Sequence, residues 1–469
     1  MKKRLFFLIC LLITFFSSCT LAPKYSRPDA PVPANWPTGT SYDESKYSVV
    51  SSNPSKLSWK EFFTYNRLKK IIEISLNNNR DMRLASLNVE KVRNLYGIQR
   101  AELFPTVNAV GIGNKQGVPK DLSMTGESMT TEQYGINLGI ASWEIDLFGR
   151  IRSLQNRALE EYLSTEQAMR GAQIALVTEV SRAYLTLAAD RENLKLSEST
   201  LKAQREAYDL VQKLDEIGLG AKLDIRRVQT QVDTARENVI RFRQLVAQDK
   251  NALDLLAGSL VPEELLPEDI EKVTPPKEIY PGLSSTALLN RPDIMAAEHR
   301  LKGAYAFIGA ARAAFFPRIS LITSLGTASD ELSNLFSSGS NTWNFAPQIA
   351  IPIFDARTWS AFRVSEAERK IALTQYEKTV QNAFREVADT LAVQVTVDQQ
   401  IKAHESLLEA SSEIYAISQE RYRNGIDTYL SVLDAQRALF SAQQGLIALR
   451  FIKLTNHVRL YAVLGGGAE

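Results

Sequence analysis

The sequence predicts a mainly α-helical chain with a small β part, in which one structural unit occurs twice. Three observations support this fold class: very long helical segments, four runs of alternating residues, and an internal repeat at an offset of about 210 residues. The 469 residues are 45% hydrophobic and 23% charged, which excludes wholesale disorder. After the N-terminus no stretch of about 20 apolar residues occurs, which excludes a polytopic helical membrane protein.

The helical segments are long and carry a seven-residue period. Residues 151–217 contain no proline and a single glycine, so a helix of about 100 Å is expected at 1.5 Å per residue. Hydrophobic residues recur at every seventh position in four such segments, as at Val180, Leu187 and Leu194 in the first. This period predicts coiled-coil packing. A water-soluble antiparallel coiled coil would show the same period and remains an alternative at this point.

Four runs, at 106–114, 133–142, 318–327 and 343–352, alternate hydrophobic with small or polar residues. Each is about 9–11 residues long, the length of a tilted strand that crosses a bilayer. A sheet of two hairpins on a soluble core is the alternative. Four strands cannot close a barrel, and an open sheet edge is not tolerated in lipid. A transmembrane sheet therefore predicts a homo-oligomer.

Two pairs of matching segments indicate an internal duplication. Residues 101–105 match 313–317, and residues 218–229 match 425–436. Two matches in the same order favour duplication over chance. The predicted parts are a signal peptide at 1–18, an extended lipid-anchored segment at 19–58, a first repeat at 59–257, a linker at 258–284, a second repeat at 285–464 and a tail at 465–469.

The N-terminus resembles a bacterial lipoprotein signal. Basic residues at 2–4 precede about a dozen apolar residues, and two serines then precede Cys19. Cleavage before Cys19 would leave its thiol for lipidation; an ordinary signal peptide with an incidental cysteine is the alternative. Thr20, in place of aspartate, implies sorting to the outer membrane. Cleavage removes three of 55 basic residues and none of 53 acidic ones, and a nearly neutral chain argues against nucleic-acid binding.

No motif of an enzyme or of a metal site is present in the sequence. The three histidines are far apart, and there is no phosphate-binding glycine loop, nucleophile elbow or HExxH motif. We therefore expect no catalytic residue, no metal ligand and no cofactor other than covalent lipid on Cys19.

Four motifs together resemble those of the TolC-like outer membrane efflux proteins, in particular the OprM-like (NodT-type) lipoproteins. They are LAPKYSRP at 21–28, WEIDLFGR at 143–150, LNRPDI at 289–294 followed by Ala297 and Glu298, and RYRNG at 421–425 followed by LDAQ at 433–436. The resemblance covers essentially the whole chain.

This resemblance implies a homotrimer with a 12-stranded transmembrane β-barrel in the outer membrane above a long coiled-coil α-barrel in the periplasm. Residues 258–284 would contribute to an equatorial belt, and Cys19 would carry N-palmitoyl and S-diacylglycerol groups. The implied function is a passive exit duct for drugs or other small molecules. The implied partners are a periplasmic adaptor (membrane fusion) protein, an inner-membrane transporter of the resistance-nodulation-division (RND) type, and outer membrane lipid.

Two groups of alternatives remain. Within transport, the chain would serve metal-ion efflux or type I secretion. In another class, it would be a non-conducting periplasmic coiled-coil scaffold lipoprotein, against which the four alternating runs argue.

The resemblance also implies a gate at the periplasmic helix tips, at Asp224, Tyr422, Asp427, Leu430 and Asp434. Leu430 and Asp434 are one helical turn apart and are expected to share a face. A leucine ring would narrow and dewet the pore, and an aspartate ring would attract cations. Asp224 is expected to accept a hydrogen bond from Tyr422. Solvated turn residues are the alternative for all five.

The adaptor-docking tips implied by the resemblance are Gly218, Leu219, Gly425 and Ile426. Glycine also ends a helix readily because it tolerates a positive φ, so a purely structural role in the turn is the alternative.

Overall fold

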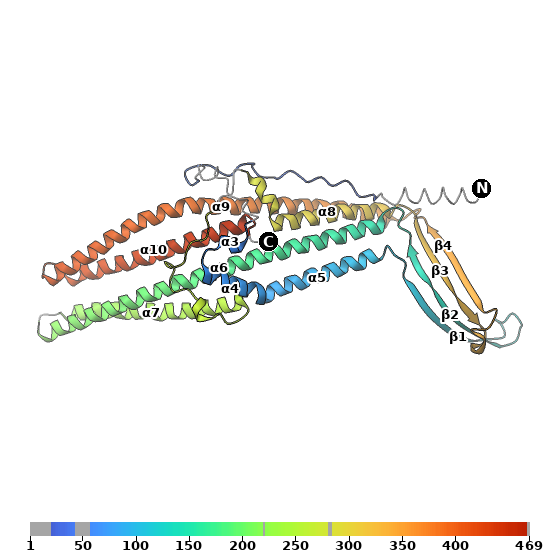
Figure 1. Cartoon of the computed structure of the whole chain (residues 1–469), viewed down its shortest axis with the longest axis horizontal. Coiled ribbons are helices and arrows are strands. Elements are labelled where there is room, and N and C mark those ends of the chain that lie inside the picture. The colour runs from blue at the N-terminus through green and yellow to red at the C-terminus, as the bar shows by residue number, and fades with distance from the viewer. Residues whose placement is uncertain (1–19, 43–56, 219–220, 280–283, 467–469) are drawn as a thin grey trace. The chain divides into compact units, whose positions relative to one another are not determined.

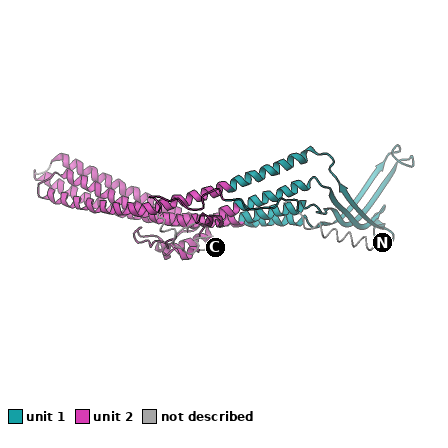
Figure 2. Ribbon diagram, turned by 90° about the horizontal axis from the view of Figure 1, so that it is seen from above, with its two compact units in different colours: residues 1–29, 89–165, 297–376 teal, residues 30–88, 166–296, 377–469 magenta. Residues whose placement is uncertain are grey.

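A computed structural model describes residues 20–42, 57–218, 221–279 and 284–466. The predicted signal peptide, the predicted lipidation residue Cys19 and the predicted docking residue Leu219 lie outside these residues. The chain divides into two compact units, which are described separately (Figure 2). Unit 1 comprises residues 1–29, 89–165 and 297–376; unit 2 comprises residues 30–88, 166–296 and 377–469.

Four long helices dominate the chain. They are α6 (Arg150–Glu216), α7 (Lys222–Ala257), α9 (Ala356–Arg423) and α10 (Tyr429–Val463) (Figure 1). The first begins and ends one residue before the segment that the sequence predicts. The parts of α6 and α9 that belong to unit 2 form antiparallel hairpins with α7 and α10. Arg243 of α7 donates to Glu198 of α6 at 2.8 Å, and Asn456 of α10 donates to the carbonyl of Thr390 in α9 at 3.0 Å.

The shorter helices end at residues whose chemistry explains their bounds. They are α3 (Trp59–Phe62), α4 (Asn66–Asn78), α5 (Arg80–Ala101) and α8 (Pro292–Ala313), with 3₁₀ turns at Glu263–Leu265 (η2), Ser285–Asn290 (η3) and Leu332–Asn334 (η4). Asn79 separates α4 from α5, and its side-chain oxygen accepts from the amides of Asp81 and Met82 at 2.9 and 3.0 Å, as an N-cap does. Pro292 opens α8, where its missing amide donor costs nothing.

One antiparallel sheet in unit 1 contains all four strands, in the order β1-β2-β3-β4 (Figure 1). They are β1 (Val107–Val118), β2 (Met129–Glu144), β3 (Arg318–Ser329) and β4 (Asn341–Ala350). The first hairpin extends further than the alternating runs predict, because polar residues also pair across it: Lys115 is opposite Glu132 and forms an ion pair with it. The fourth strand lies two residues earlier than predicted.

The joint between the two repeats is the β2–β3 pair. Gly139 of β2 is opposite Ser324, and Gly326 of β3 is opposite Asn137. A Cβ atom on Gly139 would collide with the Thr323 carbonyl oxygen, and one on Gly326 with that of Ile136. Both positions therefore require glycine for the two strands to approach. The outer edges of β1 and β4 have no strand partner among the described residues.

The strand-to-helix return after β2 shows what the WEIDLFGR motif does. The carboxylate of Asp146 accepts from the backbone amides of Ile151 and Arg152 at 3.2 and 2.9 Å, which satisfies the start of α6. Glu144 accepts two hydrogen bonds of 2.8 Å from Arg150. The motif therefore fixes the direction in which α6 leaves the sheet.

The segment that follows Cys19 packs on α8 within unit 1. The carboxylate of Glu298 is buried and accepts from the Tyr25 hydroxyl at 3.1 Å and from Arg27. Lys302, one turn along α8, lies 3.1 Å from Glu298 Oε1, the oxygen that also accepts from Tyr25. Arg312 donates to the carbonyl of Leu21 at 3.2 Å. We call residues 20–29 the N-terminal strap.

Two apolar clusters hold the hairpins of unit 2 near their turns. The tip cluster joins α6, α7 and α10, and consists of Val211, Val228, Tyr429, Val432 and Leu433. The α6–α7 cluster consists of Leu201, Val232, Ala235 and Val239. In the described part of the chain, no helix is long and apolar enough to cross a membrane.

Candidate gate at the helix tips

Both hairpin turns of unit 2 are built around a glycine in the left-handed region. Gly218 has φ +77° and Gly425 has φ +70°, and each ends a long helix in open space. The Gly425 amide donates to the Tyr422 carbonyl, and the Ile426 amide to the Arg421 carbonyl, both at 2.9 Å. Glycine adopts this conformation without the steric cost that other residues bear. Ile426 is 61% exposed, so the tip presents an apolar side chain to solvent.

The structure places Leu430 and Asp434 on the same exposed face of α10. The opposite face of that helix, with Tyr429, Val432 and Leu433, is buried in the tip cluster. The Asp434 carboxylate lies 3.5 Å from Arg437, which is one turn further along the same face. An acidic side chain and an apolar one are thus available on one surface, as a gate facing an aqueous pore requires.

Tyr422 and Asp224 do not form the expected hydrogen bond. The Tyr422 ring packs edge-on against Tyr429 with a centroid separation of 5.0 Å, while Asp224 lies 3.5 Å from Arg227, one turn along α7. Burial raises the pKa of the Tyr422 hydroxyl, and the nearby negative charge of Asp224 raises it further. The Asp224 carboxylate therefore pairs with Arg227 of its own helix, and Tyr422 contributes to the tip through its packing against Tyr429.

Asp427 closes the turn between α9 and α10. It accepts two hydrogen bonds from Arg421, at 2.6 and 3.2 Å, and this fork holds the pKa of Asp427 below its ordinary value. Arg421 was not among the site residues predicted from the sequence. Arg421 and Asp427 lie on either side of Gly425 in the sequence. A basic and an acidic residue that flank a predicted glycine turn are the signal that could have revealed this ion pair.

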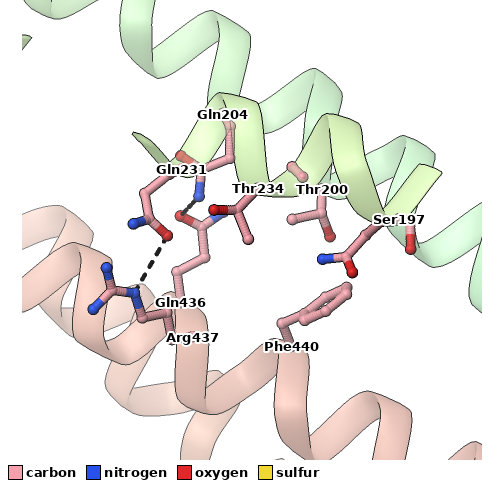
Figure 3. Close-up of a pocket in the computed structure, with 10 residues that line it drawn as sticks. Ser197, Thr200, Gln204, Gln231, Thr234, Gln436, Arg437 and Phe440 are labelled. Atoms are coloured by element: carbon pink, nitrogen blue, oxygen red, sulfur yellow. Dashed lines mark hydrogen bonds between the residues drawn. The ribbon is translucent and has the colours of Figure 1, made fainter. Parts of the chain in front are cut away.

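A group of polar side chains between the hairpins was also not predicted. The Gln204 amide of α6 donates to the Gln436 side-chain oxygen of α10 at 2.7 Å, and Arg437 donates to the Gln231 side-chain oxygen of α7 at 3.3 Å (Figure 3). We call these four residues the polar layer. The residues of α10 lie more than 200 positions from those of α6 and α7 that they contact, so no local pattern reveals the group.

The described residues contain no group of three or more His, Cys, Asp or Glu side chains that could hold a metal ion. The tips present an exposed leucine and an exposed carboxylate on α10, together with hydrogen bonds between the two hairpins.

Known proteins share this architecture over nearly the whole chain. The chain is 46% identical over 466 residues to toluene efflux pump outer membrane protein TtgC of Pseudomonas putida, covering 98% of this chain and 95% of the relative. It is 39% identical to outer membrane protein OprJ of Pseudomonas aeruginosa, covering 91% and 88%. It resembles the solved open state of the Neisseria gonorrhoeae MtrE outer membrane channel with a TM-score of 0.86 and 35% identity, covering 96% and 99%.

The family model described as outer membrane efflux protein matches residues 71–259 and 283–466, which include the four long helices and all four strands. The two matched ranges correspond to the two repeats. The chain therefore belongs to the outer membrane efflux protein family.

Proposed function

We propose that three copies of this chain form a channel that acts as the passive outer membrane exit duct of a tripartite efflux system. The observation that carries the proposal is the four-stranded sheet with an apolar stripe and two open edges. Leu138, Leu325 and Trp343 are direct neighbours across β2, β3 and β4, and each is more than half exposed. A stripe of this kind suits contact with lipid.

Closure of the sheet explains the need for three chains. A membrane-embedded sheet must satisfy every backbone hydrogen bond internally, so the edges of β1 and β4 must pair with other strands. Pairing β4 of one copy with β1 of the next extends the same antiparallel order around a ring. Three copies of the four strands give the twelve that the family resemblance implies.

The partners are a periplasmic adaptor protein, which would dock at the turns around Gly218, Leu219, Gly425 and Ile426, and an inner-membrane RND-type pump that supplies the energy. Support comes from the names of the relatives, which are outer membrane components of efflux pumps. Among these relatives are a toluene and an antibiotic efflux protein, which favours small organic solvents and drugs as the exported class. The duct itself performs no chemical step.

We also propose that Cys19 carries the N-palmitoyl and S-diacylglycerol groups that anchor the chain in the outer membrane. The lipoprotein signal supports this, and the N-terminal strap begins one residue later and is held on α8. If the anchor is correct, Cys19→Ala abolishes metabolic labelling with palmitate. Labelling that persists in this variant would rule out the assignment.

The decisive test of the duct is conductance. Purified protein reconstituted in planar bilayers should give discrete current steps, and Leu430→Ala should increase the open probability by widening the constriction. Asp434→Ala should reduce the preference for cations. Ser431→Ala is the matched control, since Ser431 is also exposed on α10 but has no predicted role. If neither the wild type nor the two gate variants conduct, the protein is a scaffold and not a channel.

A further inference from the structure

A groove in unit 2 lies between α6 and α10, far along both helices from the tip cluster. Its volume is about 410 Å³, within the range of about 300–1,000 Å³ that is typical of sites for small molecules. Polar, charged and apolar side chains line it, among them Thr178, Arg182, Val393, Ile452, Thr455 and Arg459. We call it the Arg459 groove.

Helical geometry places the Arg459 groove on the side of unit 2 opposite to η2 and α3. Tyr184 of α6 donates to the carbonyl of the last residue of η2 at 3.2 Å, and Arg182 lies two residues earlier, about 200° around the helix. Tyr461 of α10 stacks on Phe62 of α3 with ring centroids 4.0 Å apart, and Arg459 again lies two residues earlier. Both arginines are therefore exposed on the face that does not pack against η2 and α3.

The same face of α10 carries two residues of the candidate gate. Arg459 lies 29 positions after Leu430 and 25 after Asp434, which is about eight and about seven turns at 3.6 residues per turn. In the proposed duct this face lines the lumen. At about 1.5 Å per residue, Arg459 lies ~37 Å along the helix from Asp434. Salt screens charges over about 8 Å, so the acidic gate does not neutralise this arginine.

The guanidinium of Arg459 has no ion-pair or hydrogen-bond partner among the described residues. Arg182 differs in this respect, because it lies 2.8 Å from Glu179 one turn away. The hydroxyls of Thr178 and Thr455 donate to carbonyls of their own helices at 2.8 and 2.7 Å, so only their oxygens remain for a ligand. Arg459 therefore presents a charged donor fork to the groove, and this fork matches the geometry of a carboxylate or a phosphate.

The Arg459 groove also has an apolar wall. Val393 of α9 and Ile452 of α10 supply it, and Ile452 is 42% exposed, so it has surface left to cover. An apolar solute would leave the guanidinium without a partner, and an organic cation would be repelled by it. A small organic anion with an apolar body satisfies both parts of the lining.

We propose that the Arg459 groove binds small amphiphilic organic anions as they pass through the duct. Arg459 holds the anionic group, and Val393 and Ile452 cover the apolar body. An anion that has passed the carboxylates of Asp434 would find a position of lower energy here, and weak binding lets it leave again. This inference rests on the proposed channel function and specifies one class of its substrates.

The test is block of the open channel by two matched probes, 2-naphthoate and its neutral analogue 2-naphthamide, in planar bilayers with the full-length protein. We expect 2-naphthoate to block the current reversibly and at lower concentration than 2-naphthamide. Arg459→Gln should raise the half-blocking concentration of 2-naphthoate about tenfold, because a hydrogen bond to a charged group is lost, and should leave that of 2-naphthamide unchanged. Ile452→Ala should raise both, because the two probes share the apolar ring system.

Arg450→Gln is the matched control. Arg450 lies nine residues before Arg459, on the opposite face of α10, and is 3.5 Å from Glu271. Its substitution removes the same charge from the same helix outside the Arg459 groove, and should leave block by both probes unchanged. The conductance of each variant without probe shows that it has assembled.

The possible results separate the two proposals. A wild type that does not conduct would contradict the channel itself. If the wild type conducts but the two probes block it alike, the groove does not recognise the anionic group and the proposal is wrong. It is also wrong if Arg459→Gln leaves block by 2-naphthoate unchanged, or if Arg450→Gln weakens this block as much, because the overall charge of the duct would then account for it.

Discussion

The carboxylate of Glu298 illustrates how single residues of the sequence motifs find their roles. Glu298 belongs to the motif that begins at Leu289, and Tyr25 and Arg27 belong to the motif at 21–28. The structure brings the two motifs together, although they are 271 residues apart. Each motif was recognisable in the sequence as a family feature. Their contact was not predictable, because no local pattern states which distant residue a carboxylate will meet.

We expect Glu298→Gln to release the N-terminal strap. Hydrogen bonds from Arg27 and Lys302 outweigh the effect of burial and hold the pKa of Glu298 below its ordinary value of 4.5. The stabilisation is therefore complete above about pH 4.5 and is lost as the pH falls through the lower pKa of the folded state. Limited proteolysis at neutral pH should cleave residues 20–29 faster in the variant than in the wild type. Equal cleavage rates would show that the ion pair does not hold the strap.

Asp190 of α6 and Asp249 of α7 make a second residue-scale prediction. Burial and the neighbouring Asp190 carboxylate raise the pKa of Asp249 to about 7, and burial also raises that of Asp190 against the opposing charge of Arg241. The folded chain thus keeps a proton that the unfolded chain releases, and stability falls as the pH rises from about 4 to 7. Asp249→Asn should have a higher melting temperature than the wild type near pH 8, and the difference should disappear at about pH 4, below which Asp249 is protonated in both the folded and the unfolded chain.

The control for this prediction is Asp233→Asn, since Asp233 is an exposed residue of the same helix that pairs with Arg236. Its melting temperature should follow the wild type across the pH range. An Asp249→Asn variant with the same pH dependence as the wild type would contradict the raised pKa of Asp249.

At the scale of elements, side-chain periods predicted the existence of the helices and strands better than their ends. The proline-free segment at 151–217 predicted α6 almost to the residue, because proline and glycine are local signals. The ends of the first strand pair were missed, since Lys115 and Glu132 look like loop residues until they face each other. At the candidate gate, the shared face of Leu430 and Asp434 follows from helical geometry. The pairing of Asp224 with Arg227 does not follow from the resemblance.

The β2–β3 joint yields the element-scale prediction. Gly139→Ala places a methyl group against the backbone of Thr323 and Ser324, so the strands must separate there. The amount of heat-resistant oligomer in the outer membrane should fall severalfold, as measured on unboiled gels. Gly135→Ala is the control, because Gly135 lies in the same strand pair and an added Cβ atom there would make only an ordinary contact with the Thr327 carbonyl oxygen, at 3.5 Å. If both variants assemble equally well, close approach at this joint is not required.

At the scale of the whole molecule, the open edges of β1 and β4 predict the oligomeric state. Light scattering of the purified protein in detergent should give about three times the mass of one chain, after subtraction of the detergent. A stable monomer would contradict the proposed ring. The structure of one chain does not give the number of copies in the ring. The number three comes from the family resemblance, and the structure adds the two strand edges that need partners from other copies.

The internal repeat has a consequence for the origin of such a ring. Each repeat brings one strand hairpin and one pair of long helices, and β2–β3 joins the two hairpins inside one chain. A half-length ancestor would have made that joint between separate polypeptides, and would have needed twice as many of them. Fusion of two such halves would make half of the encounters intramolecular, and assembly would then depend less on concentration. It would also let the halves diverge. The Arg421–Asp427 fork closes the second tip, whereas the first repeat has Leu214 at the position that corresponds to Arg421 by the offset of the two turn glycines.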